Sequence, residues 1–307
     1  MKLESQPVYD ALPEENDLVE RYHPRFLARG GDHLVYELIE HPDVVVKAST
    51  FRIKDILVDN AERGEALDSL SDAQRAQITT KLKEKDEQSR NLRKYFGNGH
   101  TLAERRYVMK VPVTGEIVVD IFEGDWKKRV PPLGSLSIGE AWSSVVIQQR
   151  AEAIRDPAHL SLNFGGFLEE GKYDDTAIQN ILALAEQDPT LKNSLQEFVS
   201  KAISYANETG NILAMAGKDN VIFYKEDRDV DGDGNANKWN YLLVDALPIH
   251  NESVFKMSQE ISQKIANHEE ITPHEKTLLM KGSNFTRTIN NLAEKLGMSE
   301  HLELYIN

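Results

Sequence analysis

An asparagine and an aspartate in the second half of the chain carry the side-chain oxygens that a magnesium site requires. Asn220 stands just before one predicted strand, and Asp245 stands at the end of the strand predicted to pair with it. A hairpin of these strands would bring the amide and the carboxylate together. Mg²⁺ takes such hard oxygen ligands while it bridges phosphate oxygens. The two side chains could therefore act together as ligands of a hard cation such as Mg²⁺.

The acidic segment between these strands, residues 226–237, has a metal-binding pattern of its own. Asp229, Asp231 and Asp233 alternate, and Gly234 stands at the sixth position, as at the front of a calcium loop. The twelfth position holds Asn240 instead of a bidentate glutamate, and no predicted helices flank the segment. Two interpretations stay open: a Ca²⁺ site formed by the three aspartates, or a plain Asp/Gly turn at the tip of a hairpin.

Strand and helix patterns in the first half supply the elements that would position a ligand. Alternating apolar residues predict an antiparallel meander of strands 25–29, 33–39 and 44–48, with a turn at 41–43. A helix is predicted from residue 71 to about 95, with Ser71 or Asp72 as its cap. Two further strands are predicted at 107–113 and 143–148.

Helical patterns dominate after residue 151. The pattern with the clearest ends covers 189–209, where Asp188 caps the start, Pro189 occupies the first turn and Gly210 follows the end. Other helices are predicted at 176–187, 253–267, 273–281 and 285–296. The two hairpin strands, 220–225 and 240–245, lie among these helices.

The order of these elements resembles that of the protein-kinase-like superfamily. A glycine-turn hairpin, a lysine in the third strand, a long helix and a strand ending in a polar hinge precede a helical half that contains a strand hairpin. The resemblance implies an α+β, two-lobed fold. Its antiparallel-sheet N-terminal lobe would cover residues 1–149 and its mainly helical C-terminal lobe residues 150–307, with ATP and Mg²⁺ in the cleft.

The first hairpin resembles the glycine-rich loop that covers the phosphates of ATP. Leu27, Gly30 and Val35 stand where that loop has Leu, Gly and Val, and Gly31 lies in the same turn. Ala28 and His33 stand where two further glycines are expected. Such a loop needs glycine because the backbone must approach phosphate closely. The alternative is an ordinary Gly-Gly turn.

Lys47, at the end of the third strand, would be the phosphate-binding lysine. Because side chains alternate along a strand, Val45 and Lys47 share a face, so Val45 would cover the adenine while Lys47 reaches the α- and β-phosphates. The long helix should supply a glutamate that pairs with Lys47, for which Glu84 and Glu87 are candidates. The alternative is that Lys47 is an ordinary lysine at a strand end and that the two glutamates lie on a solvated face of the helix.

The resemblance also assigns the hinge and the metal ligands. Residues 148–150 would form the hinge, with Gln149 offering backbone groups to adenine. Asn220 would follow the catalytic loop, and Asp245 would take the place of the metal-binding aspartate, with Asp-Ala-Leu instead of Asp-Phe-Gly. Two residues capping strand ends would give the same pattern.

The catalytic base of the family has no counterpart. The aspartate that accepts the substrate proton belongs about five residues before the metal-binding asparagine, where Ala214 and Met215 stand. Asp219 is the one nearby carboxylate. Natural loss of the base and its deliberate removal would both give this sequence. We therefore predict either an atypical, impaired phosphotransferase acting on an unidentified protein or small molecule, or a pseudokinase that serves as an interaction scaffold.

Composition excludes several other classes. The 307 residues contain no cysteine, so disulfides, thiolate catalysis and Cys-ligated metals are excluded. The formal charge of −14 argues against binding nucleic acid or an anionic membrane with the general surface. The first residues do not resemble a signal peptide, and no apolar run is long enough to span a bilayer. A cytoplasmic protein is expected.

A different functional class is suggested by residues 290–297, Asn-Asn-Leu-Ala-Glu-Lys-Leu-Gly. They resemble the first helix and turn of a helix-turn-helix DNA-binding motif. Only ten residues follow Gly297, and the segment from Met280 onward has no basic excess. A packing helix of the C-terminal lobe is the preferred interpretation.

Overall fold

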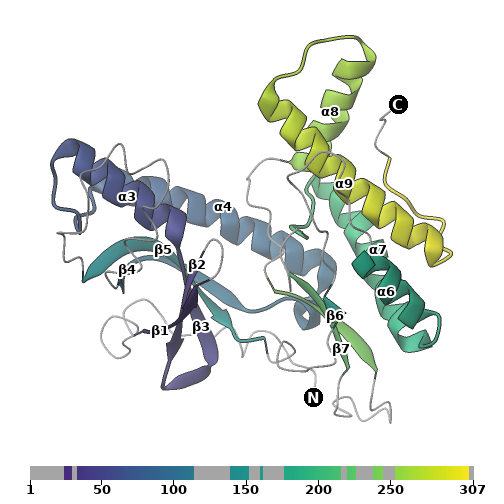
Figure 1. Cartoon of the computed structure of the whole chain (residues 1–307), viewed down its shortest axis with the longest axis horizontal. Coiled ribbons are helices and arrows are strands. Elements are labelled where there is room, and N and C mark those ends of the chain that lie inside the picture. The colour runs from purple at the N-terminus through teal and green to yellow at the C-terminus, as the bar shows by residue number, and fades with distance from the viewer. Residues whose placement is uncertain are drawn as a thin grey trace. The chain divides into compact units, whose positions relative to one another are not determined.

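Two sets of elements make up the α+β fold, a five-stranded antiparallel sheet with its helices and a mainly helical part (Figure 1). The computed structural model describes residues 24–29, 33–113, 139–151, 160–161, 176–215, 220–225, 238–244 and 253–303. Of these, the residues within 4–87 and 103–150 form one compact unit, here called the sheet unit. Those within 88–102 and 151–307 form the other, here called the helical unit.

The sheet unit contains the predicted meander. Its strands are β1 (Arg25–Arg29), β2 (His33–Leu38), β3 (His41–Ser49), β4 (Glu104–Pro112) and β5 (Glu140–Gln149), in the spatial order β1-β2-β3-β5-β4. The turn before β3 was predicted at 41–43, which is wrong. His41 already pairs with Leu38, so the turn consists of Ile39 and Glu40.

One face of this sheet forms a hydrophobic core with a helix that the sequence patterns did not predict. Leu34, Tyr36 and Val46 are fully buried on that face. Helix α3 (Thr50–Arg63) adds Ile53 and Leu57 to the same core. It directly follows β3, and its ends carry ordinary signals that the sequence contains: Ser49 accepts a hydrogen bond from the backbone N–H of Arg52, and Gly64 ends the helix with φ 68°.

Helix α4 (Asp72–Phe96) confirms the predicted long helix and begins with a capping box. Ser71 Oγ accepts a hydrogen bond from the backbone N–H of Gln74, and Gln74 Oε1 accepts one from the backbone N–H of Ser71. The sequence left Ser71 and Asp72 as alternative caps, and the structure selects Ser71. The first turns of α4 belong to the sheet unit and its last turns to the helical unit.

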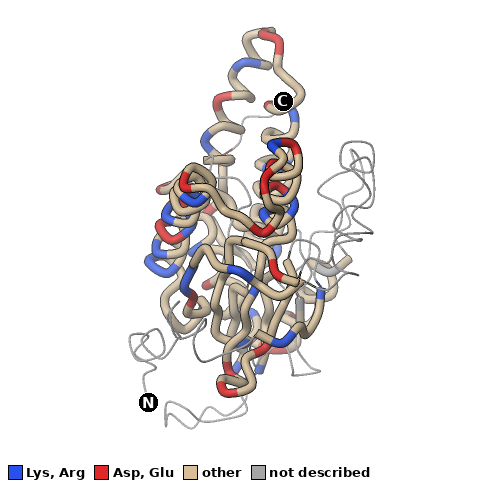
Figure 2. The backbone as a smooth tube through the Cα atoms, turned by 90° about the vertical axis from the view of Figure 1, so that its left-hand side faces the viewer, with Lys and Arg blue, Asp and Glu red and all other residues tan. Residues whose placement is uncertain are grey.

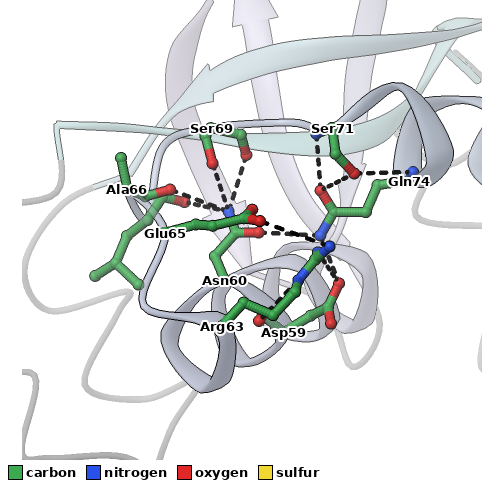
Figure 3. A network of polar contacts seen from close by, with 9 residues as sticks. Asp59, Asn60, Arg63, Glu65, Ala66, Ser69, Ser71 and Gln74 are labelled. Carbon is green, nitrogen blue, oxygen red and sulfur yellow. Dashed lines mark hydrogen bonds and ion pairs between the residues drawn. The ribbon is translucent and has the colours of Figure 1, made fainter.

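A buried asparagine fixes the connection between α3 and α4 (Figure 3). The side chain of Asn60 is fully buried, and its Nδ2 lies 2.9 Å from the carbonyl oxygen of Ser69 and 3.2 Å from that of Ala66. Its Oδ1 accepts a hydrogen bond of 3.0 Å from Gln74 Nε2, which also donates to Asp59 Oδ2. One side chain thus holds the loop and the first turn of α4 together.

Replacing Asn60 by alanine should lower the free energy of unfolding of the sheet unit by about 1–3 kcal/mol, because the buried carbonyl groups lose their donor. Hydrogen exchange of the α3 and α4 amides would measure the loss. The exposed Gln77, on α4, provides the control: Gln77→Ala should change the value by less than about 0.5 kcal/mol. Equal effects of both variants would contradict a structural role for Asn60.

The helical unit is built on helix α7 (Pro189–Thr209), whose bounds and caps agree with the prediction. Asp188 accepts hydrogen bonds from the backbone N–H groups of Thr190 and Leu191, and Gly210 follows with φ 71°. The other elements are α6 (Thr176–Ala185), the 3-10 turn η1 (Asn98–His100), and strands β6 (Leu160–Ser161), β7 (Val221–Lys225) and β8 (Trp239–Leu243). The strands form a small antiparallel sheet in the order β6-β7-β8.

The C-terminal helices differ from the prediction. Helix α8 (Val254–Ala266) was expected, but the two helices predicted at 273–281 and 285–296 are one helix, α9 (Pro273–Lys295). From the sequence, Gly282 indicates a break between two helices. In the structure it lies within α9, at the point where α8 packs against that helix. A Cβ atom at this position would lie 2.1 Å from Ser258 Oγ, so only glycine permits the close packing of the two helices.

In the part of the chain that the structure describes, no helix combines the length and apolar character needed to cross a membrane.

Candidate functional site

Strands β7 and β8 form the hairpin that the sequence predicted around Asn220. Val221 pairs with Leu243, and the backbone N–H of Val244 donates a 3.0 Å hydrogen bond to the carbonyl oxygen of Asn220. The residue directly before Asp245 therefore lies opposite Asn220. The bounds are shorter than predicted, because regular pairing covers 221–225 and 239–243.

The segment before Asn220 is closed into a loop by the Asn220 side chain. Asn220 Nδ2 donates a 2.7 Å hydrogen bond to the carbonyl oxygen of Ala214. Met215 and Leu213 are fully buried in the core of the helical unit, whereas Ala214 is partly exposed. The side chain at 214 therefore leaves the core, and the side chain at 215 does not. Of the two positions that the sequence analysis compared with the catalytic base of kinases, Ala214 is partly exposed and Met215 is buried.

The start of this loop is anchored by the end of α7. The carbonyl oxygen of Gly210 accepts hydrogen bonds from the backbone N–H groups of Phe255 and Lys256, at 2.8 and 3.2 Å. A Cβ atom at Gly210 would lie 2.9 Å from Lys256 Cβ, and the positive φ is also unfavourable for other residues. Glycine at this position thus lets α7 end directly against the start of α8.

In the sheet unit, Lys47 lies on the face of β3 opposite the hydrophobic core. Strand pairing places Lys47 beside Val35 of β2 and Val146 of β5. Val146 pairs in turn with Arg106 of β4. Val45 lies on the same face as Lys47, as the alternation predicted, and is buried. Lys47 is partly exposed, and among the described residues it forms no salt bridge.

The acidic side chain of α4 that pairs with a cation of this sheet is Asp86, which the sequence analysis missed. Asp86 Oδ1 lies 2.9 Å from Arg106 Nη1, and Glu104 Oε1 lies 2.6 Å from Arg106 Nη2. Glu87 is exposed, and Glu84 is exposed too. Asp86 follows Ile78 and Leu82 at intervals of four, so the apolar stripe of the helix contained the signal.

The Arg106 side chain is only 5% exposed and the Glu104 side chain 9%. Burial by itself would lower the pKa of the Arg106 guanidinium, but the ion pairs with Glu104 and Asp86 outweigh burial and raise that pKa. The second oxygen of Glu104 lies 3.5 Å from Gln148 Nε2. The buried guanidinium of Arg106 therefore has a carboxylate at both Nη1 and Nη2, and a buried ion needs such partners.

The predicted hinge is part of a strand. Gln149 is the last residue of β5, and its backbone N–H donates a 2.9 Å hydrogen bond to the carbonyl oxygen of Ala103. The backbone N–H of Arg150 donates a 2.7 Å hydrogen bond to the carbonyl oxygen of Asp43. These two donors are used within the sheet unit and are not available to adenine.

The remaining predicted site residues lie outside the residues that the structure describes. They are two of the glycine-loop residues, the candidate base, the second metal ligand and the three calcium-loop aspartates: Gly30, Gly31, Asp219, Asp245, Asp229, Asp231 and Asp233. In the described ranges, no group of three or more His, Asp or Glu side chains is arranged to hold a metal ion.

The segment that resembled a helix-turn-helix motif is the last part of α9. No helix follows it within residues 296–303. Instead, the side chain of Asn290 pairs with both backbone groups of Leu302, at 2.8 and 2.9 Å. Figure 2 shows basic and acidic residues mixed along the described helices. The C-terminal segment thus serves to pack the helical unit.

Comparisons of this chain with protein-family models, with curated proteins and with solved structures find no match.

Proposed function

We propose that the chain is a kinase-like protein that binds ATP together with Mg²⁺ or Mn²⁺, and that it transfers the γ-phosphoryl group slowly because it lacks a catalytic base. The observation that carries this proposal is the hydrogen bond from Asn220 Nδ2 to the carbonyl oxygen of Ala214, combined with the bond between Val244 and Asn220. These two bonds support the proposal because they tie Asn220 to Ala214 and bring the residue before Asp245 opposite Asn220.

The bond made by Asn220 favours a role in metal binding. Its Nδ2 is used to close the loop, which fixes the orientation of the amide and leaves Oδ1 as the atom for a hard cation. Asp245 would add a carboxylate from the strand end opposite. A preorganised pair of oxygens avoids the entropy cost of ordering the ligands when the metal binds.

Lys47 supports the nucleotide part of the proposal. It lies on the third strand, on the same face as Val45 and beside Val35, opposite the hydrophobic cluster that Tyr36 and Val46 form. A lysine without an ion-pair partner among the described residues can neutralise phosphate charge. The candidate glutamates Glu84 and Glu87 stay proposals as its partners, and Gly30 and Gly31 would cover the phosphates.

The test is thermal unfolding with ATP, with and without Mg²⁺ or Mn²⁺. At a ligand concentration about 100-fold above Kd, binding stabilises the folded protein by about 2.7 kcal/mol, which corresponds to a rise in Tm of about 5–10 °C. Asp245→Ala should remove the dependence on metal, and Lys47→Met should weaken the nucleotide effect. Lys81→Met, on the exposed surface of α4, is the matched control and should leave the shift unchanged.

The absence of a shift with every nucleotide and metal would overturn the proposal and favour the scaffold alternative, a kinase-like fold that serves only for interaction. A shift that survives Lys47→Met and Asp245→Ala unchanged would place any nucleotide elsewhere on the chain. Titration with Ca²⁺ in the same assay tests the calcium loop, because Asp231→Ala and Asp233→Ala should abolish a local effect of that ion.

A further inference from the structure

The connection between α4 and β4 follows strand β8, the last strand in the order of the small sheet. The ring of His100 stacks on the ring of Tyr241, with centroids 3.8 Å apart and planes inclined by 4°. His100 Nδ1 also lies 2.9 Å from the carbonyl oxygen of Tyr241, which can only accept a hydrogen bond. The next residue, Thr101, forms an isolated parallel bridge with Leu243. Two consecutive residues of the connection are thus attached to β8.

The third residue of the connection, Leu102, packs against the side chains at the end of this strand. It is 7% exposed and forms a small hydrophobic cluster with Leu242 and Ala151, against which Val244 also packs. Because side chains alternate along a strand, Leu242 and Val244 lie on one face of the chain. All members of this cluster belong to the helical unit. Leu102 therefore fixes one face of the chain that leads out of β8.

The connection is itself braced where it leaves α4. Both the backbone N–H of His100 and the hydroxyl of Thr101 donate hydrogen bonds to the carbonyl oxygen of Gly97, at 3.3 and 3.2 Å. The preceding residue, Phe96, is fully buried, and its carbonyl oxygen accepts a 3.0 Å hydrogen bond from Lys201 Nζ of α7. A segment that is bound at its start in this way can hold a neighbouring strand in place.

The strand that the connection holds leads to the candidate metal site. Val244 stands directly before Asp245, and its backbone N–H donates a 3.0 Å hydrogen bond to the carbonyl oxygen of Asn220. Its side chain packs against the cluster that contains Leu102. The residue that precedes the second candidate ligand is thus held through its backbone by one neighbour and through its side chain by another.

We propose that residues 100–102 position the candidate metal site, with Leu102 as the main positioning residue. By holding β8, they keep Val244, and with it Asp245, opposite Asn220, so that less order has to be imposed on the two ligands when Mg²⁺ binds. The inference rests on the proposed function, because the place of Asp245 matters in this way only if that residue binds the metal.

A positioning role differs in its consequences from ordinary packing in the core. A leucine that only fills the core supports the whole helical unit, so its loss weakens all hydrogen bonds of the unit together. A positioning leucine should loosen the end of β8 more than the rest and should lower the affinity for the metal. Leu278 of α9, which is 1% exposed in the main core of the same unit, provides the matched control.

The first experiment measures hydrogen exchange of single amides. Leu102→Ala should speed exchange at Val244 by about tenfold or more, because the variant removes the packing at that residue. The rise should be smaller at Phe255, whose N–H donates a 2.8 Å hydrogen bond to the carbonyl oxygen of Gly210 in the same unit. Leu278→Ala should not favour Val244 over Phe255. An equal rise at both amides in Leu102→Ala would overturn the proposal.

The second experiment titrates Mg²⁺ at saturating ATP and follows Tm. Leu102→Ala should raise the Mg²⁺ concentration that gives half of the metal-dependent shift by about 3–10-fold, the cost of ordering one side chain on binding. The shift with ATP alone should stay the same. Leu278→Ala should leave the Mg²⁺ dependence unchanged. His100→Phe keeps an aromatic ring but loses the Nδ1 donor, so it should act in the same direction as Leu102→Ala with a smaller effect.

The outcomes separate this inference from the function on which it rests. If the unmodified protein shows no Mg²⁺-dependent shift, the proposed function is wrong and the positioning role falls with it. If the unmodified protein shows the shift and Leu102→Ala keeps the same Mg²⁺ dependence, the positioning role alone is overturned. Should Leu102→Ala not fold, Leu102→Val takes its place in both experiments, because valine leaves a smaller cavity.

Discussion

Replacing Arg106 by methionine should destabilise the sheet unit by about 3–5 kcal/mol. The reason is the carboxylate that stays behind. Glu104 is 9% exposed, and without Arg106 its carboxylate loses the guanidinium that lies 2.6 Å from its Oε1. Hydrogen exchange of the β4 and β5 amides measures the local free energy of unfolding.

Two further variants separate the buried charge from simple loss of packing. Combining Arg106→Met with Glu104→Gln also removes the buried carboxylate charge that has lost its guanidinium, so more than half of the lost stability should return. Asp86→Asn should cost only about 1 kcal/mol, because the Asp86 side chain is 38% exposed and water can replace its partner. If the double variant is no more stable than Arg106→Met alone, the buried charge is not the cause.

Restoring a carboxylate by Ala214→Asp should raise the rate of γ-phosphate transfer by about 10²–10⁴-fold, the usual contribution of a general base. The side chain at 214 leaves the core, and its backbone is held 2.7 Å from the Asn220 amide, so a new carboxylate would stand beside the candidate metal ligand. ATP affinity should change little, because a base acts mainly in the transition state. Turnover of labelled ATP with a hydroxyl acceptor measures the rate.

Met215, the residue after Ala214, provides the control that tests which of the two positions corresponds to the base. Met215 is fully buried in the helical core, so Met215→Asp should unfold the helical unit instead of activating it. Met215→Leu keeps the volume and should change neither stability nor transfer appreciably. Robust transfer by the unmodified protein that Asp219→Asn leaves unaltered would show that the catalytic loop has been misplaced.

Local signals in the sequence predicted the elements well where a helix or strand has its own start and stop residues. Helix α7 agrees with its prediction because Asp188, Pro189 and Gly210 act within a few residues of the helix ends. Helix α3 begins and ends at the same kinds of signal, Ser49 and Gly64. The helix was missed because its polar and apolar residues are mixed and because it follows β3 without a loop. Its stability comes from packing Ile53 and Leu57 into the sheet.

The candidate site was predicted in part. The hairpin that brings residue 244 opposite Asn220 follows from strand pattern alone, because two short strands separated by a turn segment pair with each other. The partner of Arg106 was missed, although Asp86 continues the interval of four from Ile78 and Leu82, because the sequence does not show which strand residue that side of α4 contacts. Asp86 lies on the side that faces Arg106, and the neighbouring Glu87 does not.

The sequence by itself determined the antiparallel meander with Lys47 on its third strand, helices α4 and α7, and the hairpin after Asn220, because each depends on residues close together in the chain. Only the tertiary structure decided that Ala214 is the position outside the core, that Gly282 lies inside one continuous helix, and that His100 meets Tyr241 and Glu197. These facts depend on packing between segments that lie as much as 141 residues apart. No local pattern records such contacts, since they are fixed by which buried surfaces fit together.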